Sequence, residues 1–181
     1  MLRKLALGAL VVVAALALYV ATRPAEFHIE RATTIAAPPE RIFPLVNDFR
    51  AWPRWSPYER KDPSMTRMLG GAESGVGATY AWDGNEDVGA GRMMITESVP
   101  ERRIGIRLEF LRPMTATNEV AFVFEPVAEG TRVVWGMDGR NGFLGKLAAL
   151  LLDVDAMVGA DFEAGLAALR SAAEAEGAPV R

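Results

Sequence analysis

Three polar residues lie among apolar strands, where their side chains could act on a ligand. Glu97 shares its strand phase with Met93 and Ile95, Asn118 lies on the apolar phase of a later strand, and Asp83 ends another strand. A carboxyl group enclosed by apolar side chains has a raised pKa, so it can act as a general acid or orient a ligand hydroxyl. Glu97 and Asp83 are therefore the candidate catalytic residues. The alternative is that both carboxylates face solvent, as charged side chains usually do.

Composition excludes most other site chemistry. The chain has no cysteine, which excludes thiol catalysis, disulfides and thiolate metal sites. Its single histidine, His28, excludes a multi-histidine metal site, and its phase opposite to Phe27 and Ile29 predicts a solvent-facing side chain. The glycines of residues 70–91 match neither a P-loop nor a strand–GxGxxG–helix unit, so they are typical of hairpins and bulges. No metal or cofactor is expected.

Large aromatic and methionine side chains on the strands and on the last helical segment are candidates for the lining of a cavity. Ligand pockets have mostly apolar walls with a few polar groups, and methionine adapts to irregular shapes. The predicted ligand-binding residues are Trp55, Tyr80, Trp82, Met93, Ile95, Ile106, Asn118, Phe122, Trp135, Met137, Met157 and Phe162. The alternative is that these side chains pack against one another as a solid core.

The most regular element that can position these residues is a helix predicted over 142–177. Apolar residues recur there in steps of three and four: Phe143, Leu147, Leu150, Leu151, Val154, Val158, Phe162, Leu166 and Leu169. This spacing forms one apolar stripe on an α-helix. No helix of similar length precedes it in the domain, so a curved antiparallel sheet is the expected partner of the stripe.

Short alternating segments upstream supply that sheet. The predicted strands are residues 27–35, 65–69, 78–83, 91–99, 103–111, 115–125 and 131–138. In the fifth strand, Ile104, Ile106, Leu108 and Phe110 alternate with polar or small residues, as expected of a sheet packed on one face.

The segment between the first two strands is predicted to be partly helical. Pro38 and Pro39 stop the first strand, and residues 40–49 predict a short helix with proline in its first turn. Residues 52–58 are rich in aromatics and prolines, so they predict a helical turn followed by an ordered loop. This loop is a packed structural segment, a lid over the cavity, or an anchor at a membrane surface.

The N-terminal segment predicts a membrane anchor. Leu5 to Ala21 are 17 residues without a charge, near the short end for crossing about 30 Å of hydrocarbon. A cleaved secretory signal peptide and a buried core helix are the alternatives. Arg3 and Lys4 before the span predict a single-pass protein with a cytoplasmic N-terminus and its domain on the exported, periplasmic side, although Arg23 argues weakly the other way.

The predicted organisation is an anchor at residues 1–22, a linker at 23–26, one domain at 27–176 and a tail at 177–181. Residues 24–181 carry all 23 acidic residues and 17 of the 20 basic ones. This acidic balance excludes a nucleic-acid reader that depends on neutralising phosphates.

Four runs of this sequence resemble the SRPBCC proteins, the START and birch-pollen-allergen helix-grip superfamily. They are TIAAPPERIF at 34–43, WPRWSP at 52–57, WDGN at 82–85 and DAMVGADFEAGL at 155–166. The resemblance covers residues 27–176, and its bacterial members are often labelled polyketide cyclase/dehydrase-like. It implies an α+β helix-grip fold, in which a seven-stranded antiparallel sheet and two short helices close around the long C-terminal helix. In that superfamily the fold encloses a cavity for hydrophobic ligands.

Three functions are compatible with these features. The first is a membrane-anchored, non-catalytic binding domain that holds a hydrophobic or amphipathic, lipid-like small molecule. The second is an enzyme similar to polyketide cyclases or dehydratases, which needs an ionisable group in the cavity. The third is an envelope interaction module that binds through its outer surface, which a large exposed apolar patch would indicate.

Overall fold

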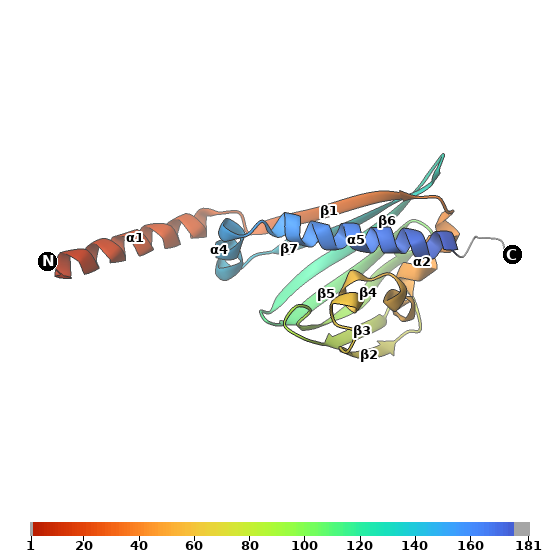
Figure 1. Cartoon of the computed structure of the whole chain (residues 1–181), viewed down its shortest axis with the longest axis horizontal. Coiled ribbons are helices and arrows are strands. Elements are labelled where there is room, and N and C mark those ends of the chain that lie inside the picture. Colours follow the sequence, from red (N-terminus) through yellow and green to blue (C-terminus); the bar gives the residue numbers. More distant parts are fainter. Residues whose placement is uncertain (1, 176–181) are drawn as a thin grey trace.

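In the computed structural model, which describes residues 2–175, a seven-stranded antiparallel sheet curves around a long helix (Figure 1). The strands are β1 (Glu26–Ile35), β2 (Thr66–Gly71), β3 (Ala78–Asp83), β4 (Ala90–Val99), β5 (Arg103–Arg112), β6 (Ala116–Val127) and β7 (Gly130–Arg140). Their order is β1-β7-β6-β5-β4-β3-β2, so β1 crosses over to pair with β7 and the other neighbours follow the chain. The predicted α+β helix-grip class is confirmed. The predicted tail, 177–181, lies outside the described residues.

The chain between β1 and β2 is helical over most of its length. It forms α2 (Pro39–Asn47), the 3-10 helix η1 (Phe49–Arg54) and α3 (Pro57–Lys61). Pro39 and Pro57 each occupy the first turn of an α-helix, where the missing N–H of proline costs no hydrogen bond. The side chain of Asp48 accepts a hydrogen bond from the backbone N–H of Arg50 at 2.9 Å and so begins η1.

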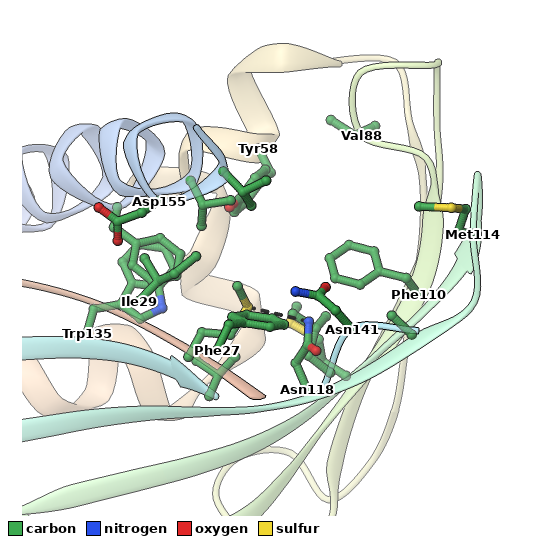
Figure 2. Close-up of a pocket in the computed structure, with 18 of the residues that line it drawn as sticks. Phe27, Ile29, Tyr58, Val88, Phe110, Met114, Asn118, Trp135, Asn141 and Asp155 are labelled. Carbon is green, nitrogen blue, oxygen red and sulfur yellow. Dashed lines mark hydrogen bonds between the residues drawn. The ribbon is translucent and has the colours of Figure 1, made fainter. Parts of the chain in front are cut away.

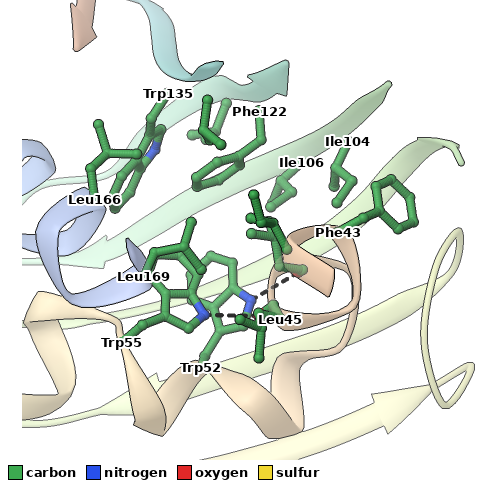
Figure 3. Packing of buried hydrophobic residues seen from close by; sticks show 14 of the residues in the cluster. Phe43, Leu45, Trp52, Trp55, Ile104, Ile106, Phe122, Trp135, Leu166 and Leu169 are labelled. Carbon is green, nitrogen blue, oxygen red and sulfur yellow. Dashed lines mark hydrogen bonds between the residues drawn. The ribbon is translucent and has the colours of Figure 1, made fainter. Parts of the chain in front are cut away.

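The aromatic loop is part of the core. Trp52 and Trp55 are buried, and their indole N–H groups donate to the backbone oxygens of Val46 and Leu45 at 3.0 and 2.8 Å (Figure 3). Because both indoles are enclosed and hydrogen-bonded to α2, they are not available to act as a membrane anchor. The structure shows the packed alternative for this segment.

The prediction of one helix over 142–177 is wrong in one respect. The structure has two helices there, α4 (Phe143–Leu151) and α5 (Val154–Ala175). Leu152 between them is extended, with φ −125° and ψ 139°. The side chain of Asp153 then accepts a hydrogen bond from the backbone N–H of Ala156 at 3.0 Å, as an N-cap does. The apolar steps of three and four continue through this junction, which is why the periodicity alone did not reveal the break.

Helix α5 lies across the concave face of the sheet and packs on it closely (Figure 1). Phe162, Leu166 and Leu169 are buried against the strands. Gly165 faces the ring of Trp135, and a Cβ atom there would lie 2.6 Å from Cζ3 of Trp135 and 3.0 Å from Cδ of Pro57. Glycine at this position therefore allows the helix and the sheet to approach.

One cationic side chain of β1 also holds α5. The guanidinium of Arg31 contacts Asp155 at 2.9 Å and Glu163 at 3.0 Å. It occupies the space beside Gly159, where a Cβ atom would lie within 1.9 Å of Nη2 of Arg31. Since one arginine meets two carboxylates two turns apart, this contact sets the register of α5 along β1.

Gly165→Ala is expected to destabilise the fold although alanine is the better helix former. The gain in helix propensity is about 1 kcal/mol, whereas overpacking a filled core costs about 1–3 kcal/mol. Urea unfolding of the full-length protein in detergent should therefore show a lower midpoint. Adding Trp135→Phe removes the clashing ring edge, so the double variant should lose less stability than the sum of the two single variants. A Gly165→Ala protein more stable than the wild type would contradict this account of the helix–sheet contact.

Candidate functional site

A cavity of about 880 Å³ lies between the concave face of the sheet and the first turns of α5 (Figure 2). This volume is within the range of about 300–1,000 Å³ that is typical of small-molecule sites. Paired positions across the sheet form one row along its wall: Phe27, Gly139, Asn118, Leu108, Met93 and Tyr80. Ile29, Met137 and Val120 form the row beside it. The wall is therefore built by the inward phase of six adjacent strands.

Most of the predicted ligand-binding residues line this cavity. They are Tyr80, Trp82, Met93, Asn118, Trp135, Met137 and Phe162. Their contact with a ligand stays a prediction, but the structure brings their side chains to one enclosure. The strand residues among them were identified by alternation. Alternation shows which residues share one face of the sheet, but not which part of that face another element covers.

The other five predicted residues do not line the cavity. Trp55, Ile95, Ile106 and Phe122 are buried in the core, where α5 and the helices after β1 pack directly on the sheet. They share the inward face but lie beyond the end of the cavity. Met157 is 61% exposed, on the side of α5 that faces away from the sheet. A helix buries only one side, and Met157 lies outside the stripe that runs through Val154, Val158 and Phe162.

Several lining residues were not identified from the sequence. They include Phe27, Tyr58, Val88, Leu108, Phe110 and Met114, together with residues 149–154. Leu108 and Phe110 carried a usable signal, because they alternate with polar residues in β5. Val88 and Met114 lie in the connections after β3 and β5, where no periodicity predicts the direction of a side chain.

Glu97 and Asp83, the candidate catalytic carboxylates, both lie outside the cavity. The β4–β5 register shifts between Ile95 and Glu97, so Glu97 pairs with the outward-facing Gly105. A bulge of this kind reverses the strand phase, and the phase shared with Ile95 was therefore misleading. Glu97 instead accepts a hydrogen bond from Nε of Arg103 at 2.8 Å on the outer face. Asp83 is exposed and paired with Arg112.

Among the carboxylates that line the cavity, Asp87, Asp153 and Asp155 are exposed, whereas Glu59 of α3 is buried. Glu59 was not identified from the sequence. Its side chain is buried, with Oε1 accepting a hydrogen bond from the Tyr80 hydroxyl at 2.7 Å and Oε2 accepting one from Nε of Arg67 at 2.6 Å. Burial, followed by the contact with Glu59, raises the pKa of Tyr80. The hydrogen bond to Glu59 raises the pKa of Arg67. Both carboxylate oxygens are occupied, so this cluster joins α3 to β2 and β3.

Two polar groups in the apolar wall have incomplete hydrogen bonding. Asn118 is 6% exposed, and its Nδ2 contacts only the sulfur of Met137, at 3.5 Å (Figure 2). Its side-chain oxygen accepts no hydrogen bond from the described residues. The indole N–H of Trp135 is buried and also has no partner among residues 2–175. A buried unpaired group such as this indole N–H costs about 1–3 kcal/mol. The amide of Asn118 lies in the cavity wall, where a ligand can hydrogen-bond to it.

His28 lies at the rim of the cavity with its side chain half exposed. Its Nδ1 is 2.7 Å from Oδ1 of Asp138, and its Nε2 is 3.6 Å from Oε2 of Glu30. The hydrogen bond with Asp138 is the main cause of a raised pKa of His28. The prediction that this side chain faces solvent agrees with its exposure.

Comparisons with known proteins address the fold and the family. The profile of a family described as polyketide cyclase/dehydrase and lipid transport matches residues 26–174. A comparison with curated proteins finds no match.

Solved structures of low sequence identity have the same fold. The protein TTHA0849 of Thermus thermophilus is 21% identical with a TM-score of 0.60, over 84% of this chain and 100% of that one. The Aha1 protein of Colwellia psychrerythraea, solved as a dimer, is 19% identical with a TM-score of 0.59, over 84% and 99%. The di-domain ARO/CYC StfQ of the steffimycin biosynthetic pathway is 14% identical with a TM-score of 0.64, over 84% and 52%.

The raised pKa of His28 is directly measurable because the chain has a single histidine. The imidazole resonance should titrate above the usual value of about 6.5, and Asp138→Asn should lower that midpoint. Because the folded-state pKa is raised, the stabilisation is present below the unfolded pKa and is lost as the pH rises through the folded one. A midpoint unchanged by Asp138→Asn would contradict the contact, and Asp153→Asn, which does not touch His28, is the control.

Proposed function

Because the chain belongs to the polyketide cyclase/dehydrase and lipid transport family, we propose that its cavity holds a hydrophobic or amphipathic, lipid-like small molecule. The observation that carries this proposal is the cavity of about 880 Å³ between sheet and helix, with walls of aromatic, aliphatic and methionine side chains. An apolar cavity lacks the polar partners that hold ordered water, and it binds apolar molecules. Each methylene group buried there contributes about 0.8 kcal/mol.

Asn118 supports an amphipathic ligand over a purely hydrocarbon one. Its amide lies in the middle of the wall row, between Gly139 and Leu108, with an oxygen that accepts no hydrogen bond from the described residues. A ligand hydroxyl or carboxyl group placed there can donate to this oxygen and accept from Nδ2. The rest of the ligand then contacts apolar side chains on both sides of that point.

We also propose that α1 (Leu2–Thr22) anchors the domain in a membrane, with the N-terminus cytoplasmic and the domain on the exported side. The apolar stretch within Arg3–Thr22 has a mean hydropathy of 2.5, and only 6% of it is buried by the rest of the protein. A membrane span and a signal sequence share this length and composition, whereas a core helix would be covered by the rest of the protein. Arg3 and Lys4 before the apolar run support the orientation.

A second candidate function is an enzyme similar to polyketide cyclases and dehydratases. Tyr80 supports it, because its hydroxyl lies in the cavity wall against the buried Glu59. A phenol is protonated at neutral pH even at its ordinary pKa of about 10. For the phenol to act as a general acid, its proton must turn from Glu59 to a substrate oxygen. Glu59 itself is held by Arg67 as well, so it is better placed to orient Tyr80 than to accept a proton.

Filling the cavity should remove the ligand without unfolding the protein. Met93 lines the cavity, whereas its neighbour Met94 faces outward on the same strand, so Met93→Trp and Met94→Trp form a matched pair. Native mass spectrometry of the full-length protein in detergent should show a retained small molecule in the wild type and in Met94→Trp, but not in Met93→Trp. Equal occupancy in all three proteins, or no retained molecule in any of them, would contradict the binding proposal.

Tyr80→Phe separates binding from catalysis. For a binding domain, the variant should retain the same molecule as the wild type, because the phenol is hydrogen-bonded to Glu59. For a cyclase or dehydratase, the wild type should hold product and the variant should accumulate substrate, so the retained masses should differ by one water for a dehydration. The exact mass of the extracted ligand decides between these outcomes, and circular dichroism checks the fold.

A further inference from the structure

Helix α4 exposes an apolar surface unusual for a domain in water. None of the side chains of Phe143–Leu151 is buried, although the sequence of the helix is FLGKLAALL. Phe143, Leu144, Leu151 and Leu152 are 49, 64, 77 and 53% exposed. The single charged residue within Phe143–Leu151 is Lys146. Contiguous exposed apolar side chains of this kind mark an interaction surface.

The same segment forms part of the cavity. Ala149, Leu150, Leu151 and Leu152 contribute to its lining at the end where α5 begins. Met114, which is 52% exposed after β5, contributes to the lining near Val88 and Phe110 on the sheet side (Figure 2). The junction of α4 and α5 is therefore both a wall of the cavity and an outer surface, so whatever covers α4 also adjoins the cavity.

The position of α1 indicates what covers α4. The two helices meet at the end of the domain from which α1 extends (Figure 1). The ammonium of Lys146 donates to the backbone oxygen of Ala21 at 3.2 Å, in the last turn of α1. Tyr19 and Arg23 lie at this same end of α1, next to Ala21. The guanidinium of Arg23 is 5.5 Å from the centre of the Tyr19 ring. Tyrosine and arginine at the end of an apolar span are typical of a membrane–water interface.

We propose that α4 lies in the interfacial layer of the same bilayer that α1 crosses, so that the cavity opens toward lipid. A helix with apolar side chains on its exposed surface buries them about 5–10 Å deep in the headgroup and acyl boundary. The one cation of α4 does not oppose this placement, because it is bonded to α1. A lipid-like ligand can then pass between bilayer and cavity at the α4–α5 junction. This step rests on the proposed function, while the placement of α4 rests only on the anchoring of α1.

Depth measurements test the placement. The chain has no cysteine, so single-cysteine variants of the full-length protein carry one environment-sensitive dye each. The test sites are Leu144→Cys and Leu151→Cys, and Tyr19→Cys reports the insertion of α1. Met68→Cys is the matched control, since Met68 is 65% exposed on β2, at the edge of the sheet opposite β1. The proteins are reconstituted in phosphatidylcholine–phosphatidylglycerol vesicles containing nitroxide-labelled lipid.

The proposal expects strong quenching at residues 19, 144 and 151 and little at residue 68. Quenching at 144 and 151 no greater than at 68 would overturn it, as would an unquenched dye at residue 19. Unquenched dyes combined with efficient disulfide crosslinking between two unlabelled copies of the Leu144→Cys variant would assign the α4 surface to a second copy of the chain and also overturn the proposal.

Ligand exchange separates this inference from the proposed function. The variant Phe143→Glu/Leu144→Glu should take up the retained molecule from vesicles at least tenfold more slowly than the wild type, with Met68→Glu as the control. Occupancy after long incubation should be unchanged, because residues 143 and 144 are exposed and lie outside the lining of the cavity. A ligand that exchanges at the wild-type rate would refute the lipid-facing route and leave the binding proposal intact. If no protein retains a ligand, the binding proposal fails, and the quenching pattern alone decides the position of α4.

Discussion

The stacking of Trp135 on Phe162 is the contact on which the rest of the domain depends. The two rings are parallel within 9° with centroids 4.1 Å apart, and Gly165 lets the helix settle at that distance. On one side of this stack, α5 and the helices after β1 fill the concave sheet completely. On the other side, the helix breaks at Leu152 and the wall remains uncovered. One close helix–sheet contact thus separates a solid core from an open cavity within the same fold.

The buried polar side chains along the cavity differ in how completely they are hydrogen-bonded within the protein. This difference indicates which of them can bind a ligand. Glu59 is buried, and both of its carboxylate oxygens are hydrogen-bonded by Tyr80 and Arg67, so neither is left for a ligand. Asn118 lies in the row of paired strand positions that ends at Tyr80, and its amide can form further hydrogen bonds. A wall whose buried carboxylate is fully hydrogen-bonded and whose buried amide is not is suited to orienting a ligand. This contrast is the reason to place binding ahead of catalysis in the proposed function.

The N-terminal helix, α4 and the cavity form one continuous arrangement. Lys146 joins α4 to the end of α1, and the α4–α5 junction continues into the lining of the cavity. In the proposed topology, two features place the cavity next to the bilayer. They are the hydrogen bond from Lys146 to Ala21 and the break between α4 and α5 at Leu152. A freely tethered domain would not need an apolar helix at this point. The exposed α4 surface is the feature that a tether alone leaves unexplained.

The sequence by itself determined the strands, the apolar N-terminal segment and the buried stripe around Phe162 and Leu166, because period-2 and period-3.6 patterns are local properties of the chain. Alternation also identified Met93, Asn118 and Trp135 on the wall of the cavity. Only the tertiary structure decided where Glu97, Met157 and Glu59 lie. Glu97 changed faces because a bulge shifts β4 against β5, a feature of pairing between strands. The extent of the cavity was likewise decided by contacts between segments far apart in the chain, since the inward face of each strand continues past the point where α5 covers it.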